Sequence, residues 1–451
     1  MTRKARHRPL WVALADRLLT VGTWLVSGLA ALIVGVTAPL RRQHVANPRQ
    51  RTLLRLEPMN LEVVDRYQVE EHIAPNPNPF FLRTLQVAFV PQPGTEQQRT
   101  FSDQVSVIQV SQHPPSWLEQ IGLSTINGWW AAVRLARRLV DVCRQEHVGL
   151  VIAQDPHLLG CLGWFVARLA GVPFGIHVVQ NYDASARSVG RVAFPPFRWP
   201  MVERLVERFL FGSADLVIGN WEHYKDYALA HGASLEKSFA YRFYPSSLHR
   251  VDPGERKNLQ ATLGLEGRPI LLSVGRLHPV KYPGDLLAMM THVIADYPRA
   301  VLLMVGQGEL RPQLEREAHA RGLEESVRFL GWRSQEELLD LFVTADVIVV
   351  AHMGVALSEA ALSATPIVAY DHDWHSELLG CDERGLVVPF RDAAAMARAV
   401  VRLLEDPEFG KSLGAKARAY ALEHYSKEMA QRIEYRICER FFSTLYRSTT
   451  V

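Results

Sequence analysis

The sequence predicts an α/β protein made of two doubly wound domains that face each other across a cleft. From about residue 81, short apolar runs alternate with helical patterns, and this rhythm breaks once, near 244–257, before it resumes. Apolar strands separated by helices are typical of a parallel sheet covered on both faces. Two such domains in tandem leave a cleft at the carboxyl ends of their strands, where ligands bind.

The elements follow in order along the chain. In the first domain we predict strands at 86–92, 104–110, 149–154, 173–179 and 215–220, with helices at 127–146 and 198–212. In the second we predict strands at 269–275, 300–306, 326–331, 346–351, 366–370 and 385–389. Ser334 and Glu337 form a capping box before a helix at 335–345. Met429, Ile433, Ile437 and Phe441 recur every fourth residue, which predicts one apolar face on a final helix.

The resulting domain plan has five parts. We predict a basic flank and anchor at 1–45, a linker at 46–80, α/β domains at 81–250 and 251–425, and a C-terminal helix at 426–451. Residues 18–40 carry no charge and are long enough to span a bilayer. A signal peptide, the alternative, has an apolar core of only about 7–15 residues. A helix lying flat on the membrane is a further alternative, but the segment shows no charged face. We therefore expect a retained single-pass transmembrane helix, although arginines at both ends leave its orientation open.

The distribution of charge and the spacing of the cysteines limit the kinds of partner and compartment that we expect. Residues 1–55 hold ten basic residues and one acid, Asp16, whereas the rest holds 40 basic and 46 acidic residues. The body shows no basic stripe with interleaved aromatics, which argues against nucleic acid. The four cysteines have no spacing typical of a disulfide framework or a zinc site, so we expect a reducing compartment.

Two cations follow the first strand of the second domain. In "SVGRLHPVKY", Arg276 and Lys281 come just after Gly275, on a loop at a strand's carboxyl end. A guanidinium fork and an ammonium can converge there on one diphosphate. The alternative is a pair of solvated surface cations.

A second candidate is "AHMGVALSEAALSATPIVAY", where a strand ends near Ala351 and Gly354 allows a tight turn. The helix predicted from about Val355 offers free N–H groups to an anion. Glu359 lies one turn inside and could accept hydrogen bonds from sugar hydroxyls. Alternatively Glu359 faces solvent, but its neighbours are apolar, and an unpaired buried carboxylate is costly.

Other polar residues also follow predicted strands. Gly306 and Gly308 form a Gly-x-Gly turn in "VGQGEL", a weak signal for a nucleotide-facing loop. In the first domain, loops at strand ends are enriched in function, so we expect acceptor-side residues among Asp155, His157, Gln180, Asn181 and Asp183. His177 lies inside an apolar strand and is better explained as a core residue.

Together, "VGRLHPVKY", "VGQGEL", "VRFLGW" and "GVALSEAALSATPIVAYD" resemble, in order and spacing, the C-terminal domain of family 4 glycosyltransferases with the GT-B fold. The resemblance covers 265–425, and the N-terminal half matches only in its alternation. It implies a retaining, nucleotide-sugar-dependent enzyme whose second domain binds the donor. Arg276 and Lys281 would then hold the diphosphate, the helix start at Gly354 and Val355 would face phosphate, Glu359 would bind the ribose, and backbone near Trp332 and Arg333 would meet the base. The last helix would cross back onto the first domain.

One position departs from the family. A second Glu usually lies eight residues before the ribose ligand and contacts the donor sugar, but Ala351 stands there. His352 is a candidate to replace it, as are the acids Asp371, Asp373 and Glu377. The loss also leaves open an inactive homologue that binds nucleotide as a scaffold.

The resemblance further implies a front-face displacement in which the leaving diphosphate helps to take the acceptor's proton. We expect a UDP- or GDP-sugar as co-substrate, no tightly bound cofactor and no metal. The acids in "DHD" at 371–373 fall at the wrong place in the fold for a metal motif. A glycan or lipid-linked acceptor at the cytoplasmic side of the membrane, as in polysaccharide biosynthesis, would explain the anchor. A nucleotide-sugar epimerase or a sugar phosphorylase of the same architecture is the alternative enzyme.

Overall fold

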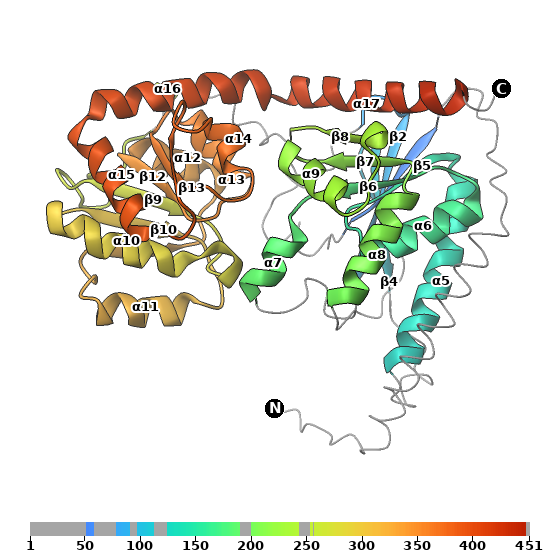
Figure 1. The fold of residues 1–451 in the computed structure, drawn as a ribbon, viewed down its shortest axis with the longest axis horizontal. Coiled ribbons are helices and arrows are strands. Elements are labelled where there is room, and N and C mark those ends of the chain that lie inside the picture. Colours follow the sequence, from blue (N-terminus) through green and yellow to red (C-terminus); the bar gives the residue numbers. More distant parts are fainter. Residues whose placement is uncertain are drawn as a thin grey trace, which may run out of the picture.

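The computed structural model describes residues 51–57, 78–90, 97–111, 124–189, 200–242, 253–255 and 257–447. Within them the chain forms two α/β halves, each on its own sheet (Figure 1). The predicted anchor at 18–40 lies outside the described residues. No helix of the described part combines the length and the apolar character needed to cross a bilayer.

The N-terminal half is built on an eight-stranded sheet with the order β3-β4-β2-β1-β5-β6-β7-β8, and only β3 runs antiparallel to its neighbour. The strands are β1 (Thr52–Leu56), β2 (Arg83–Val90), β3 (Gln97–Ser102), β4 (Val105–Ser111), β5 (Val148–Ala153), β6 (Phe174–Val178), β7 (Leu216–Gly219) and β8 (Ser238–Ala240). The helices are α5 (Ser124–Gln145), α6 (Leu158–Ala170), α7 (Tyr182–Val189), α8 (Pro200–Ser213) and α9 (Glu222–Ala230), with a 3-10 turn η3 (Leu235–Lys237).

The prediction of an irregular linker at 46–80 is wrong for residues 52–56, which form strand β1. Thr52–Leu56 lies between β2 and β5, near the middle of the sheet, and not in an irregular connection. Its side chains alternate between two cores, as those of a covered strand must. Leu54 and Leu56 belong to the core shared with α5, α6 and α8, whereas Leu53 packs with the C-terminal helix on the opposite face.

The C-terminal half is a six-stranded parallel sheet with the order β11-β10-β9-β12-β13-β14. All six predicted strands are confirmed: β9 (Ile270–Val274), β10 (Val301–Val305), β11 (Val327–Gly331), β12 (Val347–Val350), β13 (Ile367–Tyr370) and β14 (Leu386–Val388). The helices are α10 (Pro283–Asp296), α11 (Arg311–Ala320), α12 (Gln335–Thr344), α13 (Ala356–Leu362), α14 (His375–Leu379) and α15 (Ala393–Glu405), with 3-10 turns η5 (Pro253–Glu255) and η6 (Pro279–Lys281). The strand order reverses between β9 and β12, the place where doubly wound sheets bind ligands.

The predicted capping box is present. The Ser334 hydroxyl accepts a hydrogen bond from the Glu337 N–H at 3.3 Å, and the Glu337 carboxylate accepts one from the Ser334 N–H at 2.8 Å. Both bonds satisfy groups that α12 would otherwise leave open at its first turn.

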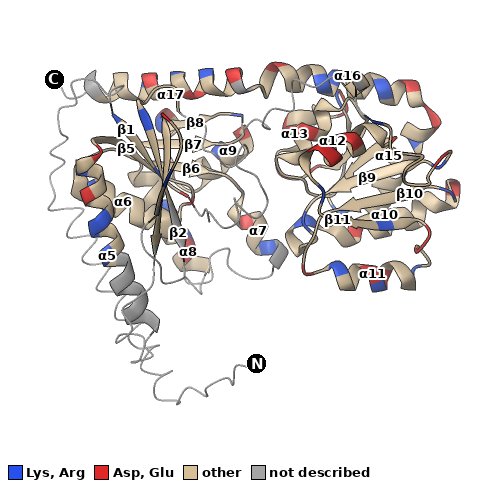
Figure 2. Ribbon diagram, turned by 180° about the vertical axis from the view of Figure 1, so that it is seen from behind, with Lys and Arg blue, Asp and Glu red and all other residues tan. Residues whose placement is uncertain are grey.

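Two long helices tie the halves together. Helix α16 (Pro407–His424) packs on α13 of the C-terminal half, and α17 (Lys427–Arg447) continues across the N-terminal sheet (Figures 1 and 2). Ile437 and Phe441 are buried against Leu53, Phe80 and Phe81, and Ile433 packs beside them. The predicted apolar face of the last helix is therefore the face that crosses back onto the first half.

Candidate active site

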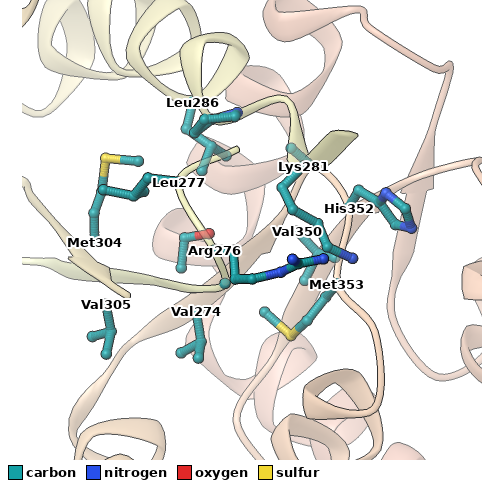
Figure 3. A pocket seen from close by; sticks show the side chains of 14 residues that line it. Val274, Arg276, Leu277, Lys281, Leu286, Met304, Val305, Val350, His352 and Met353 are labelled. Atoms are coloured by element: carbon teal, nitrogen blue, oxygen red, sulfur yellow. The ribbon is translucent and has the colours of Figure 1, made fainter. Parts of the chain in front are cut away.

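A cavity of about 320 Å³ lies between the two halves. Its N-terminal wall includes Gln154, Gln180, Asn181, Ser185 and Asn220, and its C-terminal wall includes Arg276, Lys281, His352, Gly354 and Asp373. A smaller cavity joins the ends of β9 and β12 beside it, and Arg276, Lys281 and His352 line both (Figure 3). The cleft predicted at the carboxyl ends of the strands is therefore present in the structure.

Arg276 and Lys281 lie side by side at the end of β9. Figure 3 shows their charged ends directed toward one another at the edge of the smaller cavity. Burial and the nearby Arg276 guanidinium lower the pKa of Lys281 to about 8, although the negative charge of Asp373 opposes this shift. Within the described part of the chain neither cation forms an ion pair with a carboxylate. Two crowded cations, with Asp373 near Lys281 but no described carboxylate in direct contact with either, make a site for a polyanion.

The glycines around the two cations leave room for such an anion. A Cβ built on Gly275 would meet nothing within 4 Å, and one on Gly354 would meet only the Lys281 Nζ, at 3.9 Å. Gly306 and Gly308 differ, because a Cβ there would come within 2.0 Å of the Gly275 oxygen and 2.2 Å of the Leu277 oxygen. Those two glycines allow the β10–α11 loop to pack against the β9 loop, and neither lines the two cavities.

Ala351 forms part of the wall of the smaller cavity, and the polar group at this edge comes from its neighbour His352. The His352 Nδ1 lies 2.6 Å from the Val280 oxygen and its Nε2 lies 3.1 Å from Asp373 Oδ2. The Tyr224 hydroxyl donates to the same carboxylate at 2.9 Å. Burial alone would raise the pKa of Asp373, but the hydrogen bond and nearby charge of His352 lower it to about 2. Asp373 is thus a carboxylate held in place at the cavity wall, on a left-handed backbone with φ 57°.

Glu359 lies inside α13, which begins at Ala356, one residue later than predicted. Burial raises its pKa to about 7, and the hydrogen bond donated by Gln335 Nε2 at 3.2 Å only partly opposes this. Among the described residues no cation pairs with Glu359; it is a half-buried carboxylate that accepts a hydrogen bond from the neutral amide of Gln335.

Replacing Glu359 with glutamine should stabilise the protein at alkaline pH. Because the folded state binds the Glu359 proton more tightly than the unfolded state, stability falls as pH rises from 4.5 through about 7. The variant lacks this penalty, so we expect a gain on the order of 2 kcal/mol at pH 8 that shrinks toward pH 5. Urea unfolding at both pH values measures it. An equal gain at both values would show that ionisation of Glu359 is not the cause.

The two halves touch through aromatic and polar contacts. The rings of Trp221 and Trp374 stack with centroids 4.0 Å apart, and both side chains are buried. Glu377 accepts a hydrogen bond from the Glu222 N–H at 3.0 Å and pairs with Arg242. Glu377 was predicted to bind the donor, but it lines neither cavity and serves this contact between the halves.

Other predicted donor residues lie at the far end of the strand edge. Trp332 follows β11 and is 49% exposed, and Arg333 lies 3.6 Å from Glu337 on α12. Neither residue lines the two cavities. Asp371 likewise accepts a hydrogen bond from Ser376 instead of facing the cavity.

Only some of the residues predicted for the acceptor side line the cavity. Asn181 lines the cavity, and its Oδ1 accepts from the Ala184 N–H at the start of α7. Asp155, His157 and Asp183 do not line it. His157 points into the core and lies 2.9 Å from Glu207, while Asp155 accepts a bond from the His157 N–H and Asp183 lies 3.4 Å from His231. His177, predicted as a core residue, is bonded to Asn220, and burial lowers its pKa to about 4.

The expectation that functional residues follow strands could have identified further residues of the N-terminal wall of the cavity. Asn220 ends the predicted strand at 215–220 and Trp221 follows it directly, and Gln154 ends the strand predicted at 149–154. Tyr282, the last residue of "SVGRLHPVKY", also lines the cavity. Tyr224 lines it too, but no local pattern marks this residue, and it contributes because the two halves meet there.

Comparison with known proteins identifies the family. The model for glycosyl transferases group 1 matches residues 255–420, and that for a glycosyl transferase 4-like domain matches 83–238. The alpha-D-kanosaminyltransferase of Streptomyces kanamyceticus is 31% identical over 59% of this chain and 70% of its own length. The D-inositol 3-phosphate glycosyltransferase of Streptomyces bingchenggensis is 28% identical over 58% of this chain. The match covers only 61% of the length of that relative.

Solved structures agree on the fold. HepE of Anabaena in complex with UDP has a TM-score of 0.65 at 18% identity and covers 87% of this chain and all of its own. Sucrose-phosphate synthase of Thermosynechococcus elongatus has a TM-score of 0.68, also at 18% identity, and covers 88% of this chain and all of its own. The chain therefore belongs to the group 1 glycosyltransferases and has the GT-B fold, which confirms the resemblance seen in its motifs.

Proposed function

We propose that this protein is a retaining glycosyltransferase that moves a hexosyl group from a UDP-sugar to an acceptor held by the N-terminal half. The observation that carries the proposal is the pair of cations Arg276 and Lys281, which form no ion pair with a described carboxylate. They lie at the strand-order reversal of the C-terminal sheet and on the cleft between the halves. Family membership supports the reaction class. UDP is favoured over GDP because UDP and UDP-glucose are bound by HepE, which shares the fold.

The two cations would act on the leaving group. Breaking the bond from sugar to diphosphate develops negative charge on the β-phosphate, and fixed cations in a partly dry site stabilise that charge as it forms. The leaving phosphate oxygen, on the face the acceptor approaches, then takes the acceptor's hydroxyl proton. This route retains the configuration at the transferred carbon.

His352 and Asp373 would bind the donor sugar in place of the family's missing Glu at Ala351. Both line the cavity beside the cations, and they are bonded to each other. Asp373 accepts hydrogen bonds and His352 fixes its position, so the pair offers sugar hydroxyls an acceptor that a single Glu would otherwise supply.

The acceptor wall suits an uncharged, hydroxyl-rich group. The five polar side chains named for it are amides and a hydroxyl: Gln154, Gln180, Asn181, Ser185 and Asn220. Amides both donate and accept, as sugar and cyclitol hydroxyls require. We propose a lipid-linked or cell-envelope glycan as acceptor, at the cytoplasmic side of a membrane to which the segment at 18–40 anchors the protein.

A test of the reaction uses full-length protein in detergent with UDP-glucose, UDP-galactose and UDP-N-acetylglucosamine, and with extracted lipid-linked glycans as acceptors. Transfer of sugar with retained anomeric configuration, read by NMR, supports the proposal. Nucleotide binding without transfer or hydrolysis would favour the scaffold that Ala351 suggests, and interconversion of the sugar without an acceptor would identify an epimerase.

The charge of Lys281 makes donor binding sensitive to pH. Since its pKa is about 8 in the free protein, the ammonium is lost as pH rises through that value, and affinity for a diphosphate should fall from pH 7 to pH 9. Lys281→Arg keeps its charge over this range and should show a flatter profile. Calorimetric titration with UDP at several pH values measures both. Parallel profiles for the two proteins would assign the pH dependence to another group.

A further inference from the structure

Helix α8 turns both of its carboxylates inward and three of its large apolar side chains outward, although Leu210 and Phe211 at its end are buried in the core. Glu203 and Glu207 point inward and are 7% and 2% exposed, and both approach His157 Nε2, at 3.5 Å and 2.9 Å. Met201 and Leu205 point outward and are 71% and 61% exposed, and Phe209 is 45% exposed although one edge of its ring contacts Trp164 of α6. A surface helix normally buries its apolar stripe and exposes its acids.

The outward residues form one continuous face. Met201, Leu205 and Phe209 are spaced by four residues, so they lie above one another along the helix. Arg204 and Arg208 are exposed beside them, and both line a shallow depression of about 290 Å³ together with Met201 and Leu205. Between Met201 and Phe209 both carboxylates are buried, so the exposed face of the helix is apolar and positively charged.

We propose that this face of α8, defined as Met201, Arg204, Leu205, Arg208 and Phe209, docks on the surface of an anionic lipid bilayer. Apolar side chains with arginines beside them suit the boundary between headgroups and acyl chains. Each arginine can bury its stem among lipids while its guanidinium stays with phosphate. The inward turn of both acids removes the charges that an anionic surface would repel.

The size of the face also favours lipid over a protein partner. A stable protein interface takes about 20–30 residues from each side. Five side chains on one helix fall well short of this, whereas a bilayer needs no matching shape. Helix α7, whose Ala184 and Ser185 line the cavity, lies at the same end of the N-terminal half as α8 in both views (Figures 1 and 2). Docking there would hold the acceptor wall near the membrane.

The experiment uses the full-length chain and reads the surroundings of single sites, because the apolar segment at 18–40 can bring the protein to vesicles by itself. In a background with Cys161→Ala and Cys381→Ser, an environment-sensitive fluorophore is attached through Met201→Cys. The control carries it through Leu235→Cys, since Leu235 is equally exposed, at 71%, on η3. Vesicles are phosphatidylcholine alone or an equimolar mixture with phosphatidylglycerol.

We expect a blue shift and quenching by brominated lipid for the probe at position 201 with anionic vesicles, and neither at position 235. Arg204→Gln and Arg208→Gln should each weaken this contact about fivefold. These positions are exposed, and a melting curve for each variant checks that it is folded. An unchanged probe at 201, equal shifts at both positions, or a lipid-free shift that grows with protein concentration would overturn the proposal; the last would indicate a second copy of this chain.

Discussion

Arg276→Ala is expected to lower kcat by about 10²–10³-fold while leaving the fold intact, and Lys281→Ala should have a similar effect. Each variant removes a charge that stabilises the leaving diphosphate, and neither residue contributes to an ion pair within the described residues. Initial rates of sugar transfer under saturating donor measure the loss.

A matched control lies on the same half. Arg321 pairs with Glu317 on the surface of α11, far from both cavities, so Arg321→Ala should keep its rate. If Arg276→Ala and Arg321→Ala were equally active, the two cations would not be the leaving-group site.

Glu434→Ala is expected to destabilise the protein by roughly 3–5 kcal/mol. Glu434 on α17 pairs with Arg55, the fourth of the five residues of β1, and the two side chains are only 9% and 13% exposed. Removing the acid leaves the guanidinium buried beside Glu57 alone, and it loosens the helix that ties the halves together. Chemical unfolding followed by circular dichroism measures the change.

Two further variants separate the buried pair from a general effect on α17. Glu439 is an exposed carboxylate on the same helix, so Glu439→Ala should cost little. The double variant Arg55→Met with Glu434→Leu should regain part of the lost stability, because it removes both charges of the pair but leaves Glu57 without its nearby cation. A loss in Glu434→Ala no larger than in Glu439→Ala would contradict the role of the pair.

The C-terminal sheet could be predicted from sequence because its strands are continuous apolar runs. Strand β1 could not, since "TLLRL" follows an arginine-rich stretch and carries a charged residue, Arg55, at its fourth position. Its burial depends on Glu434, a partner 379 residues away. Strand β3 is a polar edge strand and β8 has three residues, so neither has the pattern of a covered strand.

The residues of the site, like the strands, could be predicted from the sequence only in part. Position at a strand's end correctly placed Arg276 and Lys281 on the cleft, but it does not say which way a side chain turns. His157 occupies such a position and turns inward, because Glu207 of α8 offers it a buried partner. Asp373 was predicted from the family's missing Glu, yet its fixed geometry depends on Tyr224 of the other half. Contacts between the halves cannot be derived from local pattern.

The most direct test of a nucleotide-sugar site at Arg276 and Glu359 is a thermal melt of the full-length protein with a panel of UDP- and GDP-sugars. Arg276→Ala and Glu359→Ala are melted in parallel. A ligand at 100 times its Kd stabilises by about 2.7 kcal/mol, which is readily seen as a rise in Tm. We predict that one UDP-sugar stabilises the parent and neither variant. If no nucleotide sugar raises the Tm of the parent, or if both variants respond as the parent does, the assignment of the donor site is wrong.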